Sequence, residues 1–220
     1  MTGFEPATLR TQSGCASKLR HIPVGTIVVV TGQTWCMPIS DSDDLIATIV
    51  ATVGSREPAC GRTRVLAIDG PSGSGKTVFA ERIAERFGAT VLHLEDLYRG
   101  WHGLESAPPA AAGILASIAT DRIGRAPRWD WEHGITGTDL VIAATDLLVV
   151  EGVGAGARTI APFTNLLIWL DGDESTRKDR ALERDGEVYG PWWDTWARQE
   201  REHFAREGTA TRAELHLRID

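Results

Sequence analysis

The segment Gly70-Pro71-Ser72-Gly73-Ser74-Gly75-Lys76-Thr77 fits the phosphate-binding pattern G-x-x-x-x-G-K-[ST] at every fixed position. The glycines of such a loop let the backbone turn tightly and point its N–H groups at phosphate oxygens. Lys76 is expected to neutralise charge on the β- and γ-phosphates, and the Thr77 hydroxyl to bind Mg²⁺. The predicted nucleotide-binding residues are Gly70, Ser72, Gly73, Ser74, Gly75, Lys76 and Thr77.

The flanks of this loop have the elements that it needs. Residues 65–68 form a short apolar run, typical of a strand buried on both faces of a parallel sheet. Downstream, Phe79, Ile83 and Phe87 recur at helical spacing, and Gly88 is placed to end the helix. The alternative is a Gly/Ser-rich turn that leads into an ordinary helix, but the order strand, loop, Lys-Thr and helix favours a nucleoside triphosphate site.

A carboxylate follows another predicted strand. Glu151 comes directly after the apolar run 147–150, where phosphate-loop proteins place an acid near the metal. We expect Glu151 to act in the Mg²⁺ shell, mostly through water. The alternative is an ordinary carboxylate at a strand end.

Glu95 and Asp96 lie where the predicted strand 90–94 should emerge at the carboxyl edge of the sheet, the ligand side of an open α/β fold. A carboxylate there can orient a substrate hydroxyl and accept its proton as the bond to phosphorus forms. The alternative is a solvated acidic pair at the entry of a loop.

Composition limits the classes of partner. The 220 residues carry a net charge of −7, which argues against a nucleic-acid footprint. Cys15, Cys36 and Cys60 are odd in number and lack C-x-x-C spacing, so neither a disulfide framework nor a zinc site is indicated, and a reducing cytoplasm is expected. The apolar run 27–30 is far too short to cross a bilayer. We expect a small-molecule substrate, with no nucleic-acid or membrane partner and no indication of oligomeric state.

Five segments occur in the order seen in the uridine kinase family of phosphate-loop kinases. They are the phosphate loop and residues 95–98, 128–131, 149–152 and 180–185. The chain resembles most the uridine kinase-like proteins of actinobacteria, from about residue 64 to its C-terminus. This resemblance implies ATP and Mg²⁺ as cofactors and a uridine or cytidine hydroxyl as the phosphoryl acceptor.

The resemblance also implies catalytic roles. The family's general base falls at Glu95, where the family usually has Asp, and Asp96 is next to it, so we rank the two as near equals. A helical lid is implied whose arginines close over the transferring phosphoryl group. Arg177, Arg180 and Arg184 share one helix face, and Arg180 and Arg184 are the better candidates; the alternative is a solvated charged face. Together with Lys76, these acids and arginines form the predicted catalytic set.

Acceptor binding is predicted from aromatic and polar residues. Tyr98 and Trp101 could stack on a planar group, and Arg128 and Asp130 lie in a segment that resembles the family's aromatic-acid-aromatic motif. Aromatic residues at such spacing also form cores, which is the alternative. The acceptor could equally be another alcohol, such as pantothenate or a sugar phosphate, or the protein could bind nucleotide as a regulator without efficient phosphoryl transfer.

From residue 64 onward, predicted strands and helices alternate, which indicates a parallel sheet with helices on both faces. We predict an α/β, three-layer α/β/α fold with a mostly parallel five-stranded sheet and a small helical lid. Residues 61–220 form the phosphate-loop kinase domain with its lid at about 173–206. Residues 37–60 form an accessory helix and linker.

The expected N-terminal segment, residues 1–36, is a disordered or loose arm. Part of it resembles peptides that arise when a transfer-RNA gene is translated, so we hypothesise that the native chain starts at Met37. Detection by mass spectrometry of native peptides that precede Met37 would contradict this hypothesis.

Overall fold

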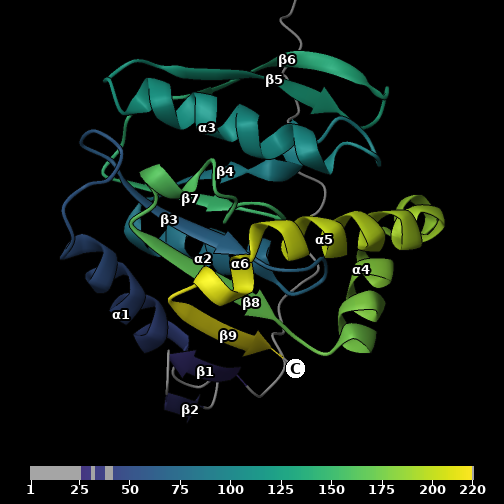
Figure 1. The fold of residues 1–220 in the computed structure, drawn as a ribbon, viewed down its shortest axis with the longest axis horizontal. Helices are drawn as coiled ribbons and strands as arrows, with labels where there is room; N and C mark the ends of the chain where they lie inside the picture. The colour runs from purple at the N-terminus through teal and green to yellow at the C-terminus, as the bar shows by residue number, and fades with distance from the viewer. Residues whose placement is uncertain (1–25, 31–32, 38–41, 220) are drawn as a thin grey trace, which may run out of the picture.

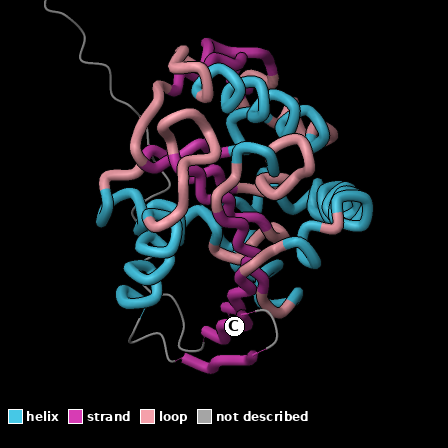
Figure 2. Tube along the Cα trace, turned by 60° about the vertical axis from the view of Figure 1, so that its left-hand side comes forward, coloured by secondary structure: helices cyan, strands magenta, loops and turns pink. Residues whose placement is uncertain are grey.

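The computed structural model describes residues 26–30, 33–37 and 42–219, and its centre is a seven-stranded sheet (Figure 1). The strand order is β2-β1-β9-β8-β3-β7-β4, in which the five strands from β9 to β4 are parallel. The strands are β1 (Thr26–Val30), β2 (Gln33–Met37), β3 (Arg64–Asp69), β4 (Thr90–His93), β7 (Leu147–Glu151), β8 (Leu166–Asp171) and β9 (Leu215–Ile219). In Figure 2 these strands run through the middle of the molecule with helices on both sides. The predicted three-layer α/β/α fold is confirmed.

Alternating side chains of β3 build the two faces of the sheet. Leu66 and Ile68 are fully buried in a cluster with α1 (Ser42–Gly54) and α2 (Lys76–Phe87). Val65 is buried on the other face, in a cluster with α3 (Ala107–Ile118). A strand buried on both faces reads as a continuous apolar run, which is why this strand could be predicted from the sequence.

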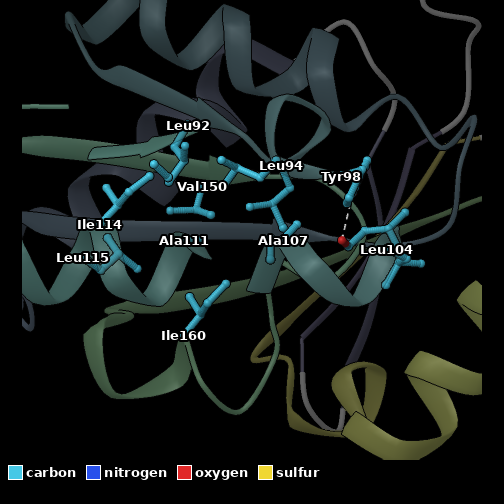
Figure 3. Packing of buried hydrophobic residues seen from close by; sticks show 14 of the residues in the cluster. Leu92, Leu94, Tyr98, Leu104, Ala107, Ala111, Ile114, Leu115, Val150 and Ile160 are labelled. Atoms are coloured by element: carbon cyan, nitrogen blue, oxygen red, sulfur yellow. Dashed lines mark hydrogen bonds between the residues drawn. The ribbon is translucent and has the colours of Figure 1, made fainter. Parts of the chain in front are cut away.

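The cluster beneath α3 joins the two strands that carry the predicted acids. Figure 3 shows Leu92 of β4 and Val150 of β7 close to Ala111 and Ile114 of α3. Burying an aliphatic side chain of this size stabilises the fold by about 1.5–3 kcal/mol. This packing fixes the carboxyl ends of β4 and β7, and hence the backbone from which the acids project.

α3 ends at Ile118. Asp121 adopts a left-handed conformation with a φ of 55°. The N–H groups of Asp121 and Arg122 then bond back to the carbonyl oxygens of Ile118 and Ser117. These bonds satisfy carbonyls at the helix end and stop the helix.

A two-stranded hairpin that was not predicted follows α3. It consists of β5 (Gly124–Asp130) and β6 (Ile135–Ile142), whose pairing shifts register between Pro127 and Trp129. Most of β6 is exposed, so it lacks the alternation of apolar and polar residues that marks a half-buried strand. The hairpin lies beside α3 (Figure 1).

The segment predicted as a lid is helical. It contains α4 (Glu174–Tyr189), the 3₁₀ turn η5 (Gly190–Trp192) and α5 (Trp193–Glu207), and the short α6 (Thr209–Arg212) leads into β9. α4 departs from helical geometry at Asp185, where φ is −131° and ψ is 24°. This kink falls at the Asp185-Gly186 step of the sequence.

The N-terminal strands extend the sheet beyond β9. β1 pairs antiparallel with both β9 and β2, so residues 26–30 and 33–36 of the expected loose arm are in strands. The β-branched run in β1 suits an extended conformation, and its pairing covers the backbone of β9. Residues 1–25 and 31–32 of that arm lie outside the described residues. α1 covers part of the segment expected to be an accessory helix and buries Ile46, Ile49 and Val53. No helix in the described part of the chain is long and apolar enough to cross a membrane.

Candidate active site

The phosphate loop lies between β3 and α2 and is anchored by Asp69. The Asp69 carboxylate is fully buried and accepts N–H groups from Gly70 at 2.7 Å, Gly154 at 2.9 Å and Gly156 at 2.9 Å. Burial raises the pKa of Asp69, while these hydrogen bonds act to lower it. Asp69 thus ties the start of the loop to the segment that follows β7.

The middle of the loop packs against the first turn of α4. Gly73 has a φ of 77°, and a Cβ atom on it would lie 2.1 Å from the carbonyl oxygen of Arg177. Only glycine fits this approach, so the sequence pattern and the tertiary contact have the same physical cause.

We expect Gly73→Ala to destabilise the protein by at least about 1–3 kcal/mol, the cost of a strained backbone conformation, and to weaken nucleotide binding. Gly113→Ala is the matched control, because Gly113 is exposed on α3 with nothing within 4 Å of its added Cβ. That control should be neutral or stabilising by about 0.5–1 kcal/mol. Urea unfolding of both variants measures the difference, and equal stabilities would contradict the close packing at Gly73.

Lys76 opens α2 and points back into its own loop. Its side chain is only 7% exposed, and Nζ donates to the Pro71 carbonyl oxygen at 2.9 Å and to Ser74 Oγ at 3.4 Å. Burial lowers the pKa of Lys76, and the nearby carboxylates of Glu151, Glu200 and Asp69 oppose this shift. The loop therefore holds a desolvated ammonium group, whose attraction to an anion is stronger than in water.

Thr77 and Glu151 meet at the side of the loop that faces β7. Thr77 Oγ1 lies 3.3 Å from both carboxylate oxygens of Glu151, which is 3% exposed. A hydroxyl and a carboxylate oxygen are ligands that suit Mg²⁺, so the residues present fit the predicted metal. His93, opposite Glu151 in the β4–β7 register, places Nδ1 2.7 Å from Oε1. This hydrogen bond raises the pKa of His93.

The structure distinguishes the two acids that the sequence left as near equals. Both lie on the 3₁₀ turn η2 (Leu94–Leu97), directly after β4. Asp96 Oδ2 pairs with Arg128 of β5 at 2.9 Å. In the described part of the chain, the Glu95 carboxylate has no hydrogen bond or ion pair.

The Glu95 side chain is exposed to solvent, but many protein atoms and several charged groups surround it. Partial desolvation raises its pKa, and the negative charges of Glu151, Asp185 and Asp96 add to this effect. Arg184 of α4 acts in the opposite direction. These surroundings favour the protonated form of Glu95 more than bulk water does.

The three predicted lid arginines have different surroundings. Arg177 contacts the loop, since its NH1 donates to the Ser72 carbonyl oxygen at 3.0 Å. Arg180 donates to the carbonyl oxygen of Ile219 at the end of β9. Arg184 pairs with Asp185 at 2.6 Å and acts electrostatically on Glu95. Arg177 therefore contacts the loop and Arg180 lies against β9, whereas Arg184 is near enough to Glu95 for its charge to lower the pKa of that carboxyl.

Two of the predicted acceptor residues have roles in the fold. Tyr98 is buried in the core, and its hydroxyl donates to the Val153 carbonyl oxygen at 2.9 Å. Asp130 accepts the N–H groups of Glu132 and His133 at 3.0 Å and caps the turn between β5 and β6. Through these contacts Tyr98 and Asp130 stabilise the fold, and neither residue is part of the proposed site.

Trp101 and Arg128 lie near the acids. The Trp131 indole N–H donates to the Glu95 carbonyl oxygen at 3.1 Å, and its ring centroid lies 4.9 Å from that of Trp101. Trp101 also stacks with Tyr189 at 5.2 Å and with Trp192 at 6.0 Å. An aromatic cluster formed by the lid, the loop after η2 and the β5–β6 turn therefore borders Glu95.

The site contains residues that the sequence analysis missed. Asp69 could have been recognised, because it is a polar residue at the end of a buried strand, directly before the loop. His93 has no distinguishing sequence signal. Glu200, which accepts hydrogen bonds from Ser72, lies 128 residues away in the chain, and no local pattern connects the two.

Comparisons with known proteins show a relative over part of the chain and solved structures of similar fold. No family model matches the chain. A cytidylate kinase of Pseudomonas aeruginosa is 34% identical over 111 residues, which take in 46% of this chain and 45% of that relative. The chain thus spans less than half the length of this relative.

The solved structures show the fold. A possible uridine kinase from Bacillus stearothermophilus has a TM-score of 0.55 at 18% identity, and the match covers 80% of this chain and 98% of that one. A putative fructose transport system kinase from Silicibacter has a TM-score of 0.49 at 14% identity, covering 64% and 79%. The first of these likenesses shows that this chain shares the fold of that structure.

Proposed function

We propose that the protein is an ATP- and Mg²⁺-dependent kinase that phosphorylates the hydroxyl group of a small molecule. The observation that carries this proposal is the convergence of three groups at the carboxyl edge of β3, β4 and β7. They are the buried Lys76, the Thr77–Glu151 pair and the carboxylate of Glu95, which has no hydrogen bond or ion pair among the described residues. A loop that only bound nucleotide would not need an acid with a raised pKa at the neighbouring strand end.

The residues suggest a division of roles. The loop N–H groups and Lys76 hold the phosphates, and Thr77 and Glu151 hold Mg²⁺, which when bound neutralises charge on the β- and γ-phosphate oxygens. Glu95 accepts the proton of the acceptor hydroxyl as its oxygen bonds to phosphorus and the bond to the ADP oxygen breaks. Arg184 is placed to stabilise negative charge near Glu95.

For the acceptor we propose a nucleoside, uridine or cytidine. This rests on the order of the sequence motifs and on the kinase names of the relative and the structural neighbour. Another alcohol, such as pantothenate or a sugar phosphate, is the alternative, because the loop, the metal pair and the base would serve it equally well.

A panel of acceptors tests the proposal. With ATP labelled in its γ-phosphate, we expect transfer to uridine or cytidine with kcat/KM of about 10⁴ M⁻¹s⁻¹ or more. Transfer only to pantothenate or a sugar phosphate would contradict the nucleoside assignment. ATP binding without transfer to any alcohol would contradict the kinase proposal and favour a nucleotide-binding regulator.

A further inference from the structure

Helix α5 contacts the phosphate loop through the side chains of Glu200 and Trp196. The Ser72 N–H and hydroxyl both donate to Glu200 Oε1, at 2.9 and 2.6 Å. Trp196, one turn earlier on α5, donates its indole N–H to the same oxygen at 2.9 Å and to Ser72 Oγ at 3.0 Å. Glu200 is 5% exposed, so one buried carboxylate oxygen accepts three hydrogen bonds, two of them from the loop.

The position of this carboxylate is unfavourable for anion binding by itself. A negative charge beside a loop that takes a triphosphate repels the ligand, and the charge of Glu200 reaches far enough to oppose the lowering of the pKa of Lys76 by burial. Hydrogen bonds to a carboxylate are, however, stronger than those between neutral groups. The arrangement therefore indicates that Glu200 holds the loop and does not itself bind the nucleotide.

The same face of α5 reaches the segment that follows the predicted base. Gln199 Nε2 donates to the Trp101 carbonyl oxygen at 2.7 Å. The centroid of the Trp196 ring lies 4.8 Å from that of Tyr98 and 6.4 Å from that of Trp101, and both pairs meet edge to face. Residues three and four apart on one helix face thus contact both the phosphate loop and the loop that borders Glu95.

We propose that Glu200 is a positioning residue that holds Ser72, and with it the phosphate loop, in the conformation that receives the triphosphate. Without Glu200, Ser72 loses its hydrogen-bond acceptor and the loop samples other conformations. Nucleotide binding must then order the loop, which makes the free energy of binding less favourable. Through Trp196 and Gln199, the same helix links the loop to the Trp101 segment. The identity of the ligand as ATP rests on the proposed function, whereas the contact between α5 and the loop does not.

Three variants test this role in the full chain. Glu200→Ala removes the acceptor, Glu200→Gln keeps an amide oxygen that can accept from Ser72, and Glu202→Gln is the matched control on the exposed opposite face of α5. By calorimetry, we expect the Kd for ATP with Mg²⁺ to rise about tenfold or more in Glu200→Ala. It should stay within about threefold in Glu200→Gln and be unchanged in Glu202→Gln. A residue that only stabilised the fold would lower Tm and leave the Kd of the folded protein unchanged.

Hydrogen exchange of the nucleotide-free protein separates this inference from the proposed function. We expect faster exchange of the amides at 72–76 in Glu200→Ala and not in Glu202→Gln. If the wild type does not bind ATP but this difference is seen, the proposed ligand is wrong and the positioning role stands. If the wild type binds ATP while Glu200→Ala matches it in both Kd and exchange, the positioning role is overturned. Should Glu200→Ala not fold, Trp196→Phe, which keeps a ring and removes the N–H donor, decides by the same two measurements.

Discussion

Lys76→Ala should lower kcat/KM for phosphoryl transfer by at least about 10²–10³-fold, the usual cost of removing one preorganised electrostatic contact to a transition state. The effect should be large because the ammonium group is buried within the loop, where water screens it little. We expect the free energy of unfolding to change by less than about 1 kcal/mol, since the two hydrogen bonds that are lost, to Pro71 and Ser74, are offset by relief of the buried charge. Steady-state kinetics and urea unfolding measure the two quantities.

Two further lysine variants complete this experiment. Lys178→Ala is the control, because Lys178 is exposed on α4 and its Nζ lies over the Trp193 ring, 5.6 Å from the centroid. It should retain activity within about threefold. Lys76→Arg keeps the charge but replaces a compact ammonium with a planar guanidinium, so it should not restore activity. Full turnover by Lys76→Ala would overturn the assignment of the loop as the site of transfer.

The nucleotide half of the site could be predicted because its determinants are local in sequence. The residues from Gly70 to Thr77 are contiguous, and the glycine at position 73 is required by a left-handed φ and a close approach to α4. The strands around the loop are buried on both faces, so they appear as apolar runs. The local sequence and the tertiary packing therefore favour the same structure at this loop, and for that reason the sequence pattern predicts it correctly.

The acceptor half could not be predicted in the same way. The difference between Glu95 and Asp96 depends on Arg128, which the unpredicted hairpin brings against Asp96. The contact between Ser72 and Glu200 depends on how α5 folds back onto the loop. Tyr98 matched an aromatic pattern, but its burial shows a role in the core. Each of these outcomes is set by tertiary contacts between distant segments, which composition and spacing do not encode.

Glu95→Gln should lower kcat for phosphoryl transfer by about 10²–10⁴-fold, because the amide cannot accept the proton of the acceptor hydroxyl. Asp96→Asn, its matched neighbour, should cost less than about tenfold, since it only weakens a partly exposed ion pair with Arg128. Both acids lie on η2 and differ in partners. Comparing the two variants therefore separates the chemistry of the base from damage to the turn that carries it.

The pH dependence gives a second, independent test of Glu95. The base acts as a carboxylate, so kcat/KM should fall as the pH drops through its pKa. Because the surroundings of Glu95 raise that pKa, the fall should be centred above the ordinary value of 4.5. Arg184→Gln removes a positive charge that lowers the pKa of Glu95, so this variant should lose activity at a still higher pH.

Loss of activity in Asp96→Asn with normal turnover in Glu95→Gln would instead make Asp96 the base. If neither substitution lowers turnover, no acid on this turn accepts the proton.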